Sequence, residues 1–224
     1  MARAGDERPI LPRLLPEMPL EPNLRLADGY EIQGVTIQGD FSEANLEELV
    51  VEESHIVRSS FTAADLSRIS LVDVLVEGCD FSGVDMEEGT FTRVMFKGCR
   101  MSGARLPRTQ MRDVTFSDVK LDDGNFRMST GERVFFDQVN LMRGDFYSAH
   151  LTSTRFFDCD LTHVDVAKAK FPGARFHGSV LLELKGSEYL RDVVIDSSQV
   201  LPLATGVFAG LNIRIEDDRD APSH

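Results

Sequence analysis

Large apolar residues recur at every fifth position through most of this chain. Between Cys79 and Leu106 they are Phe81, Met86, Phe91, Phe96, Met101 and Leu106. An α-helix repeats at about 3.6 residues and a β-strand at about 2, so neither common element explains a period of five. The register runs from Phe41 to Leu181 and is broken only at Gly131.

A second column of residues follows the same period. Two positions before each large residue the chain mostly carries Gly, Ala, Ser or Cys, as at Cys79, Ala104 and Gly124, and the positions between are mainly polar. One large and one small inward residue in every five describe a side too short to be stable alone. If four such sides close a square, a coil takes about 20 residues, and residues one coil apart lie roughly 4.8 Å apart. The pattern therefore predicts a stacked solenoid.

Four five-residue segments, NLEEL, DFSGV, DFYSA and DLTHV, match the loose consensus A(D/N)LxX. The chain thereby resembles the pentapeptide-repeat proteins. The resemblance implies an all-β solenoid, a right-handed quadrilateral β-helix of about seven to eight coils, with a C-terminal capping α-helix expected over its last coil.

The register also sorts the core into columns. One side stacks Phe96, Phe116, Phe136, Phe156 and Phe176, which predicts a ladder of aromatic rings. Another side runs Met111, Gly131, Leu151, where a missing side chain predicts a gap or a local distortion. If a gap exists, a leucine in place of Gly131 is expected to stabilise the fold.

The ends of the chain differ from the repeat. Residues 1–22 hold five of the nine prolines and predict a disordered arm. The β-helix is expected over 23–185, with an irregular first coil because Phe41 follows Ile37 after only four residues. A cap is expected over 186–215, with a helix near 197–209 that covers the open solenoid edge. Residues 216–224 are expected to form a disordered acidic tail.

The net charge of −13 opposes attraction to phosphate backbones or anionic lipid, so direct binding to nucleic acid or to membranes is not expected. The longest nearly apolar run, which starts at Leu201, is too short to span a bilayer, and no signal-peptide pattern is present. Three cysteines, an odd number, fit a reducing compartment. These features predict a cytoplasmic protein.

Little in the sequence suggests chemistry. His55, His150, His163 and His177 fall on different sides and coils, and no nucleotide-binding, hydrolase or C-x-x-C motif occurs. Cys79, Cys99 and Cys159 share the small inward column, where a thiol acts as an apolar filler. The chain is expected to be no enzyme and to use no cofactor or metal.

Charge is distributed unevenly along the chain. Residues 41–88 carry twelve acids and two bases, whereas residues 89–112 carry six bases and no acid. Two interpretations stay open: a solvated rod of uneven charge, or electrostatic docking to a bipolar partner surface.

The outward positions of the phenylalanine side are unusually apolar. Successive coils carry Leu75, Met95, Thr115 and Phe135, and Val57 and Phe157 lie two positions along on the same side. Flat sheets tolerate β-formers at exposed positions, which is one explanation. The other is that neighbouring coils join these residues into a docking or dimer patch. This side is the first candidate interaction site.

These observations predict a non-catalytic protein-interaction scaffold whose partner the sequence does not assign. The resemblance adds an alternative, since some pentapeptide-repeat proteins bind DNA gyrase or topoisomerase IV by imitating the width and charge of DNA, which protects against quinolones. For that function the candidate contacts are Glu47, Glu52, Asp65 and Asp85, and the basic residues at 93–112 depart from it. A homodimer through the C-terminal cap, using Phe208, is also left open.

Overall fold

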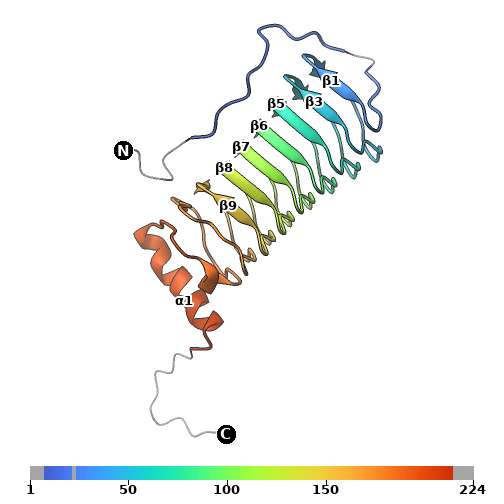
Figure 1. Cartoon of the computed structure of the whole chain (residues 1–224). Helices are drawn as coiled ribbons and strands as arrows, with labels where there is room; N and C mark the ends of the chain where they lie inside the picture. The colour runs from blue at the N-terminus through green and yellow to red at the C-terminus, as the bar shows by residue number, and fades with distance from the viewer. Residues whose placement is uncertain (1–7, 22–23, 214–224) are drawn as a thin grey trace, which may run out of the picture.

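The computed structural model describes residues 8–21 and 24–213, which form a parallel β-solenoid closed by one C-terminal helix (Figure 1). The strands are β1 (Glu31–Gln33), β2 (Thr36–Ile37), β3 (Val50–Glu52), β4 (His55–Val57), β5 (Ser70–Glu77), β6 (Thr90–Lys97), β7 (Gln110–Ser117), β8 (Thr130–Asp137), β9 (His150–Thr152) and β10 (Arg155–Phe157). They are followed by two 3₁₀ helices, η1 (Ser187–Tyr189) and η2 (Ser197–Gln199), and by the helix α1 (Val200–Gly210).

Consecutive coils pair in parallel with a register of twenty residues. Each coil has four pairing positions five residues apart, for example Asp80 with Arg100, Asp85 with Arg105, Thr90 with Gln110 and Met95 with Thr115. Four pairing positions correspond to four sides, so the predicted four-sided solenoid is confirmed. The first coil is one residue shorter, since Glu31 pairs with Val50, as the slip before Phe41 predicts.

The core consists of the stacked inward columns. Along the phenylalanine column, ring centroids lie 5.0, 5.0, 4.9 and 4.8 Å apart from Phe96 to Phe176 with nearly parallel planes. A second column brings Phe126 and Phe146 to 4.7 Å. These distances are those of favourable offset stacking, and all of these rings are buried. The predicted aromatic ladder is confirmed.

Strands β5 to β8 each continue round one corner of the square. At the corner residue the ladder is interrupted: Val72 pairs with Thr92 and Val74 with Val94, while the residues between them have positive φ, 56° at Asp73 and 53° at Arg93. Positive φ is uncommon for residues other than glycine, and here it turns the chain and points the corner side chain outward. Charged side chains can therefore form a column along this corner.

Gly131 leaves no gap in the core, so the first of the two expectations, a gap rather than a local distortion, is wrong. A Cβ atom built on Gly131 would lie 2.8 Å from Val134 Cγ2 and 2.9 Å from Leu151 Cδ2. The β-branched Val134 and the leucine of the next coil already fill the space that a larger residue would need.

The N-terminal segment differs from the expected disordered arm. Residues 8–21 lie along the solenoid, and Leu20 forms a parallel bridge with Thr36. Thr36 N donates to Pro19 O at 2.8 Å and Glu21 N donates to Thr36 O at 3.2 Å. Residues 1–7 lie outside the described residues. We call residues 8–21 the arm.

The C-terminal end is closed as expected, with shifted boundaries. Coil pairing continues to Val194, beyond the expected limit at 185, and residues 197–199 are 3₁₀ rather than α-helical. Gln199 is buried and its Nε2 donates to the carbonyl oxygens of Phe176 and Ser179 in the last regular coil. The cap thus satisfies main-chain acceptors that the open edge would expose. The expected acidic tail, 216–224, lies outside the described residues.

We predict that replacing Gly131 with leucine destabilises the protein by about 1–3 kcal/mol, because the added atoms overpack a filled core. Chemical denaturation of the wild type and of the Gly131→Leu variant measures the difference. Thr130→Ala, a change at the exposed neighbour, is the control and should leave the unfolding midpoint unchanged. A higher midpoint for Gly131→Leu would contradict the filled core.

Candidate protein-interaction surface

The apolar candidates lie on one side of the solenoid, the side whose core column is the phenylalanine ladder. We call it the arm side. Along its ladder Leu75 pairs with Met95, Met95 with Thr115, and Thr115 with Phe135. The rings of Phe135 and Phe157 are 6.4 Å apart in an edge-to-face arrangement. Leu75, Met95, Phe135 and Phe157 are half-buried, so the structure brings them together but does not leave them freely exposed.

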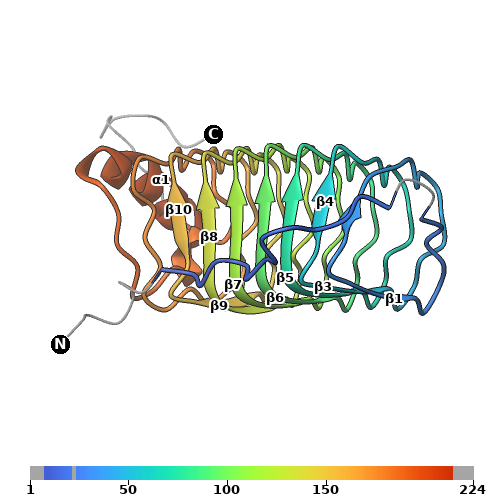
Figure 2. The same cartoon turned by 90° about the horizontal axis from the view of Figure 1, so that it is seen from above.

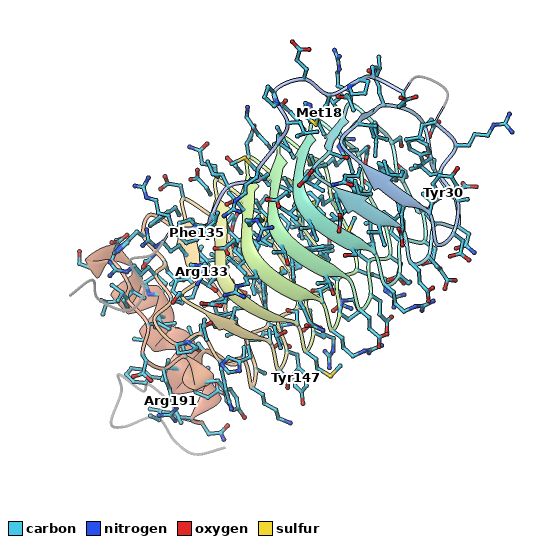
Figure 3. All side chains as sticks on the ribbon, turned by 45° about the horizontal axis from the view of Figure 1, so that its top comes forward. Met18, Tyr30, Arg133, Phe135, Tyr147 and Arg191 are labelled. Atoms are coloured by element: carbon cyan, nitrogen blue, oxygen red, sulfur yellow. The ribbon has the colours of Figure 1, made fainter. Side chains whose placement is uncertain are left out.

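The arm covers part of this surface. It crosses strands β8 to β5 toward the first coils (Figure 2), and Met18 lies near the first coils while Arg133 and Phe135 lie farther along (Figure 3). The arm contains no helical segment. Its residues therefore need anchors on the solenoid.

Two buried carboxylates of the solenoid corner anchor the arm. Ile10 N donates to Asp113 Oδ1 at 3.1 Å, and Arg13 N donates to Asp73 Oδ1 at 2.9 Å. The two acids occupy the same corner column and are separated by one coil, which contributes Arg93. Sequence reasoning missed these residues, although acids and arginines alternate at spacings of twenty along this column.

Each anchoring carboxylate is also held by an arginine of the next coil. Arg93 Nε and Nη2 donate to the two oxygens of Asp73 at 2.7 and 2.6 Å. Arg133 Nε and Nη2 donate to those of Asp113 at 2.6 and 3.0 Å. Such two-pronged pairs have fixed geometry and are strong. We call these four residues the corner column.

The corner column remains charged. Hydrogen bonds from Arg93 are the main cause that lowers the pKa of Asp73 below its ordinary value, and the Arg13 amide adds to them. For Asp113, burial alone would raise the pKa, but Arg133 and the Ile10 amide outweigh it and the net shift is downward. Both acids therefore favour the folded state above their ordinary pKa and lose that contribution as the pH falls through the lowered value.

A cleft remains between the arm and the solenoid. Its volume is about 460 Å³, and it is lined by Arg8, Pro9 and Leu11 from the arm and by Met95, Thr115, Phe135, Asp137, Arg155 and Phe157 from the arm side. The Arg155 guanidinium lies 4.7 Å from the centre of the Phe135 ring, a cation–π contact. The cleft therefore has aromatic and apolar walls with a charged rim.

The four acidic candidates do not form one cluster. Asp65 and Asp85 are neighbours in one ladder, but Glu52 lies in β3 on the adjacent side. Glu47 pairs with Arg68, and Asp85 lies 3.6 Å from Arg105. Burial is the main cause that raises the pKa of Asp85, which Arg105 opposes.

The basic residues between 93 and 112 neutralise acids of the preceding coil. Lys97 Nζ lies 2.9 Å from Glu77 Oε1, and Arg108 contacts both Glu87 and Glu88 of the preceding coil. With Arg93 and Arg105, these pairs mix the two blocks of charge seen along the sequence. On the folded surface the charges therefore alternate from coil to coil at these positions.

The described residues contain no group of three or more His, Cys, Asp and Glu side chains placed to hold a metal ion. Cys79, Cys99 and Cys159 are buried free thiols, and burial raises the pKa of Cys159 to about 12. Cys159 is therefore protonated, and all three thiols fill the core, as their column predicts.

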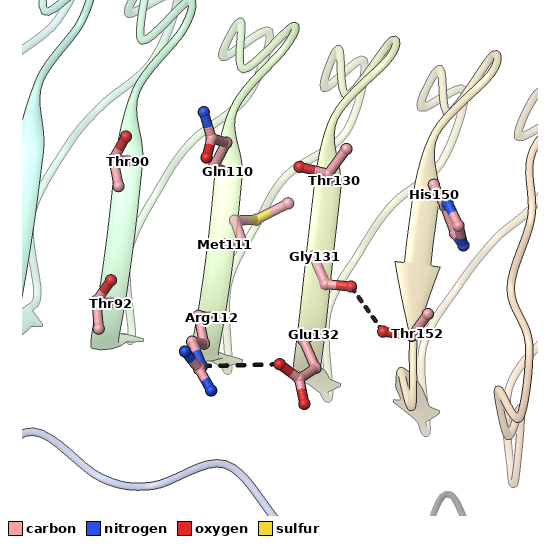
Figure 4. A pocket seen from close by; sticks show the side chains of 10 residues that line it. All are labelled: Thr90, Thr92, Gln110, Met111, Arg112, Thr130, Gly131, Glu132, His150 and Thr152. Carbon is pink, nitrogen blue, oxygen red and sulfur yellow. Dashed lines mark hydrogen bonds and ion pairs between the residues drawn. The ribbon is translucent and has the colours of Figure 1, made fainter.

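A shallow depression of about 420 Å³ lies on the neighbouring side, over β6 to β9 (Figure 4). Its polar contacts are an ion pair of Arg112 with Glu132 at 3.7 Å and a hydrogen bond from Thr152 Oγ1 to Gly131 O at 3.1 Å. Its lining combines threonines, Gln110 and His150, and no nucleophile in it is hydrogen-bonded to a base.

Within the described residues, no helix is long and apolar enough to cross a membrane.

We predict that Arg133→Ala destabilises the protein by about 3 kcal/mol at neutral pH, because it leaves the Asp113 carboxylate, whose side chain is 3% exposed, without its paired guanidinium. The loss should shrink in acid, where Asp113 is protonated in both proteins. Urea unfolding at several pH values measures it.

Arg143→Ala is the matched control, since Arg143 pairs with Asp123 twenty residues earlier but both side chains are about half exposed. This variant should change stability little. Equal losses for the two variants would show that the corner column is no stronger than a surface pair.

Comparisons with known proteins agree with the repeat. Residues 59–98 match a family model described as pentapeptide repeats (8 copies), and residues 89–163 match one described as a pentapeptide repeat region. No curated protein sequence matches significantly.

Two solved structures are among those similar to this chain. One is a trypsin-treated variant of QnrB1, a plasmid-mediated fluoroquinolone resistance protein, with 20% identity and a TM-score of 0.46 over 84% of this chain and 91% of that one. Another is HetL, a pentapeptide repeat protein involved in heterocyst differentiation regulation from the cyanobacterium Nostoc sp. strain PCC 7120, with 16% identity and a TM-score of 0.29 over 69% of this chain and 86% of that one. With the five-residue register and the four-sided coils, the two family matches show that residues 59–163 of this chain are pentapeptide repeats.

Proposed function

We propose that the protein is a non-catalytic scaffold that binds protein ligands through its arm side. The single observation that carries the proposal is that this side already holds an extended peptide segment, the arm, through Asp73 and Asp113. The two carboxylates that accept main-chain amides of the arm can accept the main-chain amides of another extended segment in the same way. A cytoplasmic location, expected from the cysteine count, is part of this proposal.

The composition of the arm side supports the same function. Phe135, Phe157, Met95 and Arg155 surround the cleft, and aromatic residues, Met and Arg are enriched in protein interfaces. The phenylalanine ladder beneath keeps the strands in place, so the surface is preorganised and its residues lose little freedom on binding.

We predict that Met95→Glu combined with Phe135→Glu preserves the fold and abolishes partner binding, because both changes put charge into the apolar cleft. Affinity capture from lysate of the native host compares the wild type with this variant, and circular dichroism checks the fold.

The matched control is Thr90→Glu with Thr130→Glu, which adds the same charges to the exposed neighbouring side of strands β6 and β8. Some proteins should be captured by the wild type but not by the arm-side variant. The control should still capture these proteins. If all three proteins capture the same set, the arm side is not the interface.

The second candidate is binding to DNA gyrase or topoisomerase IV by imitation of DNA, and the acidic ladder of Asp65 and Asp85 favours it together with the net charge of −13. The ion pairs of Glu47 and Asp85 weaken it, because they reduce the anionic field. If it holds, purified protein inhibits supercoiling by gyrase, and reversal of Glu47, Glu52, Asp65 and Asp85 to lysine removes the inhibition. No effect of the wild type would exclude this function.

A homodimer through the C-terminal cap is a further part of the proposal. No residue of α1 is buried, and on this helix Leu201 is 76% and Phe208 39% exposed. An uncharged helix that buries no side chain leaves apolar surface for a second copy.

A further inference from the structure

We propose that the arm side is a receptor for extended, proline-rich segments of partner proteins in the polyproline II conformation, and that the chain's own arm occupies it as a competitor. The inference rests on the proposed function and adds the class of ligand and its regulation. It is argued from the spacing of the corner carboxylates, from the positions of the prolines in the arm and from the lining of the cleft.

The spacing of the corner carboxylates matches a polyproline II helix. Asp113 and Asp73 are two coils apart, which places them about 9.6 Å apart along the solenoid. The amides that they accept from belong to Ile10 and Arg13, three residues apart. Three residues make one turn of polyproline II and rise about 9.3 Å. Consecutive turns of such a segment therefore meet consecutive acids of the column.

The arm sequence has the form that this spacing requires. Pro9 and Pro12 are three apart and half-buried, and each directly precedes a donating amide. Proline has no N–H, so the residue that follows it supplies the hydrogen bond. The recognised pattern is thus Pro-x-x-Pro-x, and aromatic-lined grooves are the usual receptors for it. Phe135 and Phe157 provide such walls beside Pro9.

The arm is held in a way that permits displacement. None of its described residues is buried, and Leu11 and Leu15 are largely exposed. When the arm leaves, Asp73 and Asp113 keep the two-pronged bonds from Arg93 and Arg133. The corner column is therefore not left unpaired, and water can replace the two lost amides.

The arm also leaves room for a better ligand. The cleft of about 460 Å³ lies between Pro9 and Leu11 on one wall and Met95 and Phe135 on the other. A partner segment with a larger apolar side chain at the Leu11 position would bury surface that the arm leaves exposed. Because the arm is tethered, it competes at an effective concentration in the millimolar range, which keeps weak ligands out.

The test uses the full chain with its arm released. Ile10→Pro combined with Arg13→Pro removes both donating amides and changes nothing in the solenoid. The probe is a fluorescent peptide with the sequence of residues 8–21, RPILPRLLPEMPLE, and its binding is followed by anisotropy. The peptide should bind the released variant at least about tenfold more tightly than the wild type. A control peptide with proline at the same two positions should bind neither protein.

Each outcome decides the proposal. If the peptide binds neither protein while circular dichroism shows both folded, the receptor is excluded. Equal affinity for both would exclude the arm as competitor. If the wild type doubles its mass with concentration in light scattering and the released variant stays monomeric, the ligand is the arm of a second copy and the partner proposal is wrong. A dimer through the C-terminal cap would instead form in both proteins.

The proposed function fails separately from this inference. Capture that is lost in the Met95→Glu and Phe135→Glu variant without peptide binding would keep the scaffold and exclude the proline-rich ligand. Peptide binding by the released variant, with capture unchanged by the same substitutions, would leave a peptide site that is not the protein interface.

Discussion

The stacking of one coil on the next at a register of twenty residues is the constraint on which the other features of this protein depend. It satisfies main-chain hydrogen bonds between coils and aligns the inward residues into columns, so that each ring of the phenylalanine ladder rests on its neighbour about one strand spacing away. The same alignment makes every outward position part of a column. A pattern repeated in sequence therefore becomes a stripe on the surface.

The corner column is one such stripe, and it anchors the arm. The chain turns the corner with positive φ, which sends the side chains of Asp73, Arg93, Asp113 and Arg133 outward in one line. Acids and arginines then alternate, and each arginine neutralises the acid of the preceding coil. The remaining acceptor capacity of each acid takes up an amide of the arm. The rigid repeat thus sets a fixed distance between acceptors, which a chain of matching period can use.

Much of this fold could be predicted from the sequence because the period of five is local and strict. The core columns and the first-coil slip follow from it directly, and the C-terminal cap follows from the open edge that such a solenoid leaves. That Gly131 leaves no gap could not be predicted from its position alone, because the side chains that fill the space belong to Val134 and to Leu151 of the next coil. The candidate apolar residues were found from their column, and their role in binding stays a proposal.

The position of the arm on the solenoid could not be predicted for a different physical reason. Composition describes what a segment can bury within itself, and proline-rich residues 8–21 bury little. Their anchors, Asp113 and Asp73, lie 103 and 60 residues along the chain from Ile10 and Arg13. The alternation of acids and arginines at spacings of twenty can be read from the sequence. The sequence does not show which segment of the chain contacts these residues.

Amide hydrogen exchange in the arm of the intact protein, measured by NMR at neutral pH, tests the account most directly. The amides of Ile10 and Arg13, which donate to Asp113 and Asp73, should exchange more slowly than those of Leu11 and Leu14, which donate to no described group. That alternating protection would establish the three-residue fit of the arm to the corner column. Uniformly fast exchange from residue 8 to residue 15 would contradict it.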